Sequence, residues 1–170
     1  MATLSVGGTT IFDGSTLQSD VVLTSATFPA GICRNAYFGS ATAMVAWSSG
    51  WTTACSCTCA TGRGSGDDSK FLIQGIVRIQ TTSGTSVAVA IHRNSDGEIW
   101  DGGTSVWDAS SNPNGAAFGI NYLDDIAGLI GTVTYHLKIN RIAGSGGISI
   151  NYTDGTHDQQ SSISVQEFKR

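Results

Sequence analysis

The stretch that decides the fold is TVTYHLKIN, residues 132–140. Every second residue in it is apolar, and the apolar row is Val133, Tyr135, Leu137 and Ile139. Successive side chains of a β-strand point to opposite faces of the sheet, so this alternation predicts a strand with one buried and one exposed face. Strands of this kind are typical of antiparallel sheets.

The same period of two recurs along the chain. It is found in KFLIQGIVRIQ (70–80), SVAVAIHR (86–93), ISINY (148–152) and SSISVQEF (161–168). Further strands are expected at residues 4–6, 9–12, 44–47 and 52–61. Turn residues such as Gly7-Gly8 and Asp96-Gly97 separate these segments, and no convincing helical segment alternates with them. The sequence therefore predicts an all-β fold, an antiparallel β-sandwich or barrel.

Composition agrees with one domain of this class. The chain has 170 residues, of which 40% are hydrophobic and 13% charged, and its 22 glycines against 2 prolines suit many tight turns. A Gly-, Ser- and Thr-rich leader gives way to the regular strand pattern near Asp20. We expect residues 1–19 to form an N-terminal arm that docks on a neighbour, and residues 20–170 to form the β-sandwich domain.

Charge and hydropathy argue against two classes of partner. The formal net charge is −4, and the nine Lys and Arg residues form no basic stripe, so nucleic acid is not expected as a partner. No apolar run approaches the ~20 residues that span a bilayer, so membrane insertion is not expected. The residues before Arg34 do not resemble a secretory signal, which predicts a protein made in the cytosol.

Three cysteines, Cys55, Cys57 and Cys59, lie two residues apart. Neighbours at this spacing on a strand are about 6.6 Å apart, too far for a disulfide, and the run lacks the spacing of a structural zinc site. We expect small reduced core residues. A bridge from Cys33 to one member of the run is the alternative.

No catalytic or cofactor motif is recognisable. His92, His136 and His157 fall on a polar face or beside turns, so we expect ordinary surface histidines. The alternating Asn94, Asp96 and Glu98 lack the remaining ligands of a calcium loop, and turn chemistry explains them better. The sequence therefore predicts a non-enzymatic protein without metal or cofactor.

Two Trp-Asp pairs, Trp100-Asp101 and Trp107-Asp108, flank a glycine-containing segment. Aromatic faces stack on sugar rings and carboxylates accept hydrogen bonds from hydroxyls, so these four residues are a candidate glycan or protein contact. Core or subunit-interface tryptophans are the alternative.

Three residues disturb the predicted strand pattern. Leu72 and Ile76 are apolar on a face that is otherwise polar, which indicates that part of the outer face is covered. Glu167 falls in register with the inward residues Ile163 and Val165, where a carboxylate is costly unless it is paired or lies at an open end.

The order of strand and turn motifs resembles a known group of proteins. The motifs are Thr27-Phe28-Pro29-Ala30-Gly31, Ser69-Lys70-Phe71-Leu72-Ile73, Ile91-His92-Arg93-Asn94-Ser95-Asp96-Gly97, Tyr135-His136-Leu137-Lys138-Ile139 and Ser161-Ser162-Ile163-Ser164-Val165-Gln166-Glu167-Phe168. Together they resemble small jelly-roll proteins of tailed bacteriophages, known as tail-fibre tips, head fibres or capsid decoration proteins. The resemblance covers the chain from about residue 21 onward.

The resemblance implies a trimeric, tumour-necrosis-factor-like jelly roll on the virion surface, assembled in the host cytoplasm. It implies contacts with other virion proteins of the capsid or tail, and with a host surface glycan in a fibre tip. Leu72, Ile76 and Glu167 would then lie at the trimer interface, and residues 1–19 would attach to the virion. The rival hypothesis is a stand-alone, lectin-like carbohydrate-binding module that uses Trp100, Asp101, Trp107 and Asp108.

Overall fold

We describe the fold from a computed structural model of the chain. It describes residues 3–6, 9–13, 16–17, 33–41, 43–60, 69–82, 84–94, 97–102, 106–108, 114–125, 131–152 and 160–169. The first strands are β1 Thr3–Val6, β2 Thr9–Asp13, β3 Thr16–Leu17, β4 Cys33–Ala41, β5 Val45–Ala46, β6 Thr52–Ala60 and β7 Ser69–Thr81. The later strands are β8 Thr85–Arg93, β9 Gly97–Asp101, β10 Val106–Asp108, β11 Asn114–Asp124, β12 Thr132–Ala143, β13 Ile148–Ile150 and β14 Ser161–Lys169. Every regular element in these ranges is a strand, which confirms the predicted all-β class.

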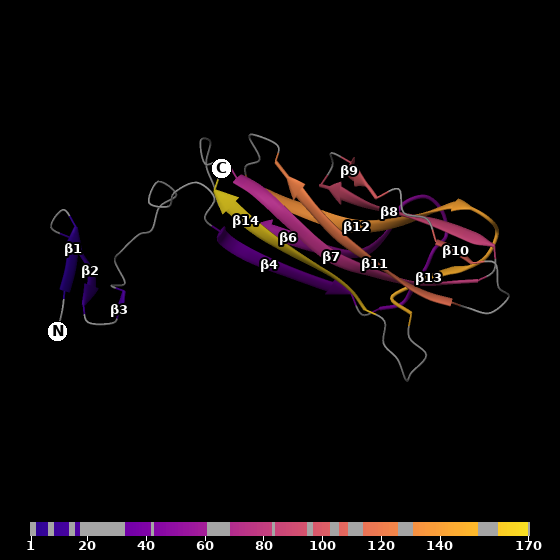
Figure 1. The fold of residues 1–170 in the computed structure, drawn as a ribbon, viewed down its shortest axis with the longest axis horizontal. Coiled ribbons are helices and arrows are strands. Elements are labelled where there is room, and N and C mark those ends of the chain that lie inside the picture. The colour runs from indigo at the N-terminus through magenta and orange to yellow at the C-terminus, as the bar shows by residue number, and fades with distance from the viewer. Residues whose placement is uncertain are drawn as a thin grey trace.

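The strands form three antiparallel sheets (Figure 1). β1, β2 and β3 pair with one another in a three-stranded sheet. A five-stranded sheet has the order β10-β8-β12-β6, with β9 also pairing with β8. A six-stranded sheet has the order β4-β14-β7-β13-β5, with β11 also pairing with β7. The five- and six-stranded sheets are the two layers of the predicted β-sandwich.

The long strands are paired as nested hairpins. β4 pairs with β14, β6 with β12, β7 with β11 and β8 with β9, so each pair encloses the next along the chain. Two further pairings, β14 with β7 and β12 with β8, join these hairpins sideways into the orders β4-β14-β7-β11 and β6-β12-β8-β9. This is the strand order of a jelly roll.

The core lies between the two sheets and follows the predicted alternation. On β7 the side chains of Phe71, Ile73, Val77 and Ile79 are fully buried, while Leu72 on the outer face is half-buried. The inward rows of β12 and β14 are buried in the same way. Alternation therefore identified the face of each of these strands correctly.

The cysteine run supplies the inward row of β6. Cys55, Cys57 and Cys59 are buried free thiols, as predicted, and Cys33 is an exposed free thiol rather than a disulfide partner. Burial, with Cys57 nearby, raises the pKa of Cys55 to about 12. All three thiols are almost completely buried, so they pack as small apolar side chains.

The two sheets are in close contact at one edge of the sandwich, between β4 and β6. A side chain at Gly39 of β4 would overlap the backbone oxygen of Ser56 on β6, so only glycine fits there. The opposite edge is formed by β11 and β9, whose residues line a pocket. The topology thus leaves an opening between the last three residues of β11 and the middle of β9.

Candidate functional site

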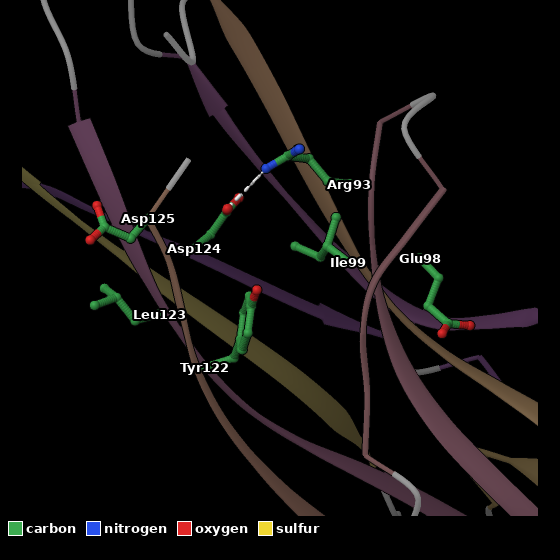
Figure 2. A pocket seen from close by; sticks show the side chains of 7 residues that line it. All are labelled: Arg93, Glu98, Ile99, Tyr122, Leu123, Asp124 and Asp125. Atoms are coloured by element: carbon green, nitrogen blue, oxygen red, sulfur yellow. Dashed lines mark hydrogen bonds and ion pairs between the residues drawn. The ribbon is translucent and has the colours of Figure 1, made fainter. Parts of the chain in front are cut away.

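A pocket of about 530 Å³ opens between β9 and β11. Its lining residues are Arg93, Glu98, Ile99, Tyr122, Leu123, Asp124 and Asp125 (Figure 2). Small-molecule sites in proteins have volumes of about 300–1,000 Å³, so the pocket is large enough for a ligand.

A buried ion pair lies at one end of the pocket. Nη1 of Arg93 donates to both carboxylate oxygens of Asp124, at 2.9 and 2.7 Å, and the Tyr135 hydroxyl donates to Oδ2 of Asp124 at 2.8 Å. Arg93 is 5% exposed and Asp124 2% exposed. Burial and the adjacent Asp124 carboxylate raise the pKa of Tyr135, so its hydroxyl remains a donor. This buried pair joins Arg93, the last residue of β8, to Asp124, the last residue of β11, and so holds the two strand ends together.

A bulge in β9 positions one apolar wall. Trp100 pairs with Ile91 and Glu98 pairs with His92, so Ile99 is an extra residue between two adjacent positions of β8. Bulges of this kind bend a strand and re-aim its side chains. Ile99 accordingly lines the pocket beside Arg93 (Figure 2).

Tyr122 forms the facing wall. Its ring and hydroxyl point towards the Arg93–Asp124 pair (Figure 2). The Trp100 ring packs against it, with ring centroids 6.3 Å apart and planes tilted by 39°. This separation is normal for a favourable aromatic pair, so Trp100 supports Tyr122 from the core side.

The lining carries more negative than positive charge. The lining includes three carboxylates, from Glu98, Asp124 and Asp125, and one guanidinium, that of Arg93. Lys70 lies at the edge, with its Nζ 3.8 Å from Oδ2 of Asp125. An exposed pair of this kind is weak, so the rim remains acidic.

The structure separates the predicted Trp-Asp contact residues. Trp100 pairs with the fully buried Ile91 and packs against the core, whereas the next residue, Asp101, is exposed. Trp107 and Asp108 lie in β10, opposite Ser86 and Thr85 of β8, and their side chains are outside the described part of the structure. Trp100 and Asp101 therefore do not share one face, and Trp100 packs against the core while partly buried.

Leu72 and Ile76 lie where the pattern placed them, on the outer face of the six-stranded sheet. Glu167 points inward and is 0% exposed, as its register predicted. Its Oε2 accepts hydrogen bonds from Asn35 Nδ2 at 3.0 Å and from the Tyr37 hydroxyl at 3.4 Å. Glu167 therefore finds partners on β4 of its own chain, and its place at a trimer interface stays a prediction.

One of the three histidines differs from the prediction. His92 was expected at the surface but is only 8% exposed, because the Trp51 ring packs edge-on against it at 5.3 Å. His136 is half-buried, and its Nδ1 lies 2.6 Å from the Ser56 hydroxyl. Burial, followed by the charge of Lys138, lowers the pKa of both histidines below 6.5. His157 lies outside the described residues.

Sequence reasoning did not find the pocket, because Arg93 and the Asp124-Asp125 pair occur at strand ends and form no recognisable motif. Among the described residues, no group of three or more His, Cys, Asp or Glu side chains could hold a metal ion. The same ranges contain no helix long and apolar enough to cross a membrane. No protein-family model matches the chain, and no curated protein matches it either.

Proposed function

We propose that this chain is a structural protein of a bacteriophage particle, displayed on the surface as a capsid decoration, head fibre or tail fibre. It assembles as a homotrimer, contacts other capsid or tail proteins, and acts by binding. The jelly-roll strand order supports the resemblance from which this proposal began, and the outer face of the six-stranded sheet is the observation that carries it.

The middle of that outer face carries no charged residue, whereas Lys70 and Arg78 of β7 lie on either side of it. Three rows cross β4, β14, β7 and β11 on it: Ala36-Gln166-Leu72-Leu123, Phe38-Ser164-Gln74-Asn121 and Ser40-Ser162-Ile76-Gly119. None of these residues is charged. Phe38 is 72% exposed and Leu123 46% exposed, which is unusual for large apolar side chains.

A face of this composition suits contact with another copy of the chain. Interface cores are depleted of charged residues, and exposed apolar patches mark protein contacts. Leu72 lies in the same row as Leu123, and Ile76 lies two rows away beside Gly119, so two of the three residues predicted for the trimer interface share this surface. The third, Glu167, points inward. Closed symmetry would bury it in each protomer.

The test is the solution mass of the full chain by light scattering. We expect about three times the 17.6 kDa of one chain. Leu72→Glu adds a charge to the uncharged middle of this face and is expected to shift the mass towards one chain. Thr53→Glu, at an exposed position on the five-stranded sheet, is the matched control and is expected to remain trimeric.

A wild-type chain that is monomeric at micromolar concentration would contradict the trimer. Equal masses for Leu72→Glu and wild type would exclude this face as the interface. A monomer that still binds sugars would favour the rival hypothesis of a stand-alone carbohydrate-binding module.

A further inference from the structure

We infer that the pocket between β9 and β11 binds an uncharged pyranose unit of a polysaccharide or glycan. None of its seven lining residues belongs to the Trp-Asp pairs that the sequence suggested. The inference adds a ligand class to the proposed function and does not depend on trimer formation.

The walls match the two kinds of surface that a pyranose presents. Its C–H face is apolar and can pack on the Tyr122 ring and on Ile99, which lie on opposite strands of the opening. Its hydroxyls need donors and acceptors close to that apolar surface. The Tyr122 hydroxyl, which points into the pocket, can serve as either (Figure 2).

Asp124 supplies a further acceptor. A carboxylate has about four lone-pair sites, and Asp124 accepts hydrogen bonds from Arg93 and Tyr135 with a single one on Oδ1. A sugar hydroxyl can therefore donate to Oδ1 without breaking the ion pair. Binding sites that combine apolar walls with a few fixed polar groups are usual for small ligands.

The site is held in place before a ligand arrives. Arg93 and Tyr135 fix the carboxylate of Asp124, and Trp100 supports the Tyr122 ring at 6.3 Å between centroids. Side chains that are already fixed lose little conformational entropy when a ligand binds. This lowers the free-energy cost of binding, which matters most for weakly bound ligands such as sugars.

Charge selects against acidic ligands. Glu98 and Asp125 lie on opposite sides of the pocket and both are exposed, so a carboxylate or phosphate on the ligand would approach negative charge from either side (Figure 2). The Arg93 guanidinium, the one cation in the lining, already pairs with Asp124. A neutral sugar is not repelled by these carboxylates and does not need a cation to balance its charge.

The experiment is saturation-transfer NMR on the full-length chain, with the methyl pyranosides of glucose, galactose and mannose as neutral probes. Glucosamine and sialyllactose are the cationic and anionic probes. We expect transfer to at least one neutral sugar and none to sialyllactose. Tyr122→Phe, which removes only the hydroxyl, is expected to weaken binding by about tenfold, the equivalent of one hydrogen bond.

Asp101→Asn is the matched control, because Asp101 is an exposed carboxylate of β9 outside the pocket lining, and we expect unchanged binding. The inference fails if no neutral sugar binds, if sialyllactose or glucosamine binds better than every neutral sugar, or if Asp101→Asn weakens binding as much as Tyr122→Phe. Light scattering of the same samples reports the trimer separately, so either proposal can fail alone.

Discussion

Asp124 is the residue on which both the stability and the pocket depend. It accepts hydrogen bonds from Arg93 and from Tyr135, and the whole residue is only 2% exposed. A buried ion pair contributes little net stability when intact, but removing one partner leaves the other charge uncompensated. The strand ends that it joins are also the two sides of the pocket.

We predict that Asp124→Ala lowers the free energy of unfolding by about 3–5 kcal/mol, because it leaves the Arg93 guanidinium buried without its carboxylate. Tyr135→Phe removes one hydrogen bond to a charged group and is expected to cost about 1.5–3 kcal/mol. Asp125→Ala is the control: its Lys70 partner is 3.8 Å away and both side chains are partly exposed, so a change within about 1 kcal/mol is expected. Urea unfolding measures all three. Equal losses for Asp124→Ala and Asp125→Ala would show that the buried pair is not formed.

His92 makes stability depend on pH in a defined direction. Its pKa in the folded chain lies below the usual 6.5 because of burial first and then the charges of Lys138 and His136. The folded chain therefore binds this proton less readily than the unfolded chain, and the resulting stability is present above pH 6.5 and is lost as pH falls towards the folded pKa. Glu98, opposite His92 on β9, is the nearest acid in the pairing register.

We accordingly predict a lower urea midpoint for the wild-type chain at about pH 5.5 than at about pH 7.5, in the window where histidines titrate. His92→Gln removes the titrating group and is expected to reduce that difference. His136→Gln reduces it too, since the pKa of His136 is also lowered. A His92→Gln variant with the full wild-type pH dependence would assign the effect to other groups.

At the scale of elements, the contact between β4 and β6 closes one edge of the sandwich. Gly39→Ala places a methyl group against the backbone oxygen of Ser56. Because this clash is with backbone, no side-chain rotation can relieve it. We predict a loss of about 1–3 kcal/mol, the usual cost of overpacking. Gly119→Ala on β11 is the matched control, because nothing lies within 4 Å of a Cβ at that position. Thermal unfolding compares them, and equal melting temperatures would mean that β4 and β6 are farther apart than described.

The elements also show what sequence alone can predict. Alternation specified the buried faces of β7 and β12, because the period of side chains along a strand is a local property. The burial of His92 could not be predicted, because it depends on Trp51, which is distant in sequence. The pocket was missed for a similar reason: it needs the Ile99 bulge on β9 and the meeting of Arg93 with Asp124, and neither leaves a periodic signal.

At the scale of the whole molecule, the nested pairing makes the sandwich self-contained. β4 opens the jelly roll and β14 closes it, and they pair from Cys33 opposite Phe168 to Ala41 opposite Ser161. The chain therefore enters and leaves the two layers at the same end. The strands β1 to β3 pair only with one another in the described part of the chain, so no hydrogen-bonded strand of the sandwich requires them.

This separation predicts that deleting residues 2–19 leaves the sandwich intact. We expect the deletion variant to keep the wild-type melting temperature and the trimer mass, because β4 retains its full pairing with β14. If the arm is the attachment segment, the same variant fails to enter phage particles when it replaces the wild-type chain, which sedimentation of particles followed by immunoblotting measures. Incorporation at the wild-type level would overturn the assignment of attachment to residues 1–19. A lower melting temperature would instead show that the arm packs against the sandwich and stabilises it.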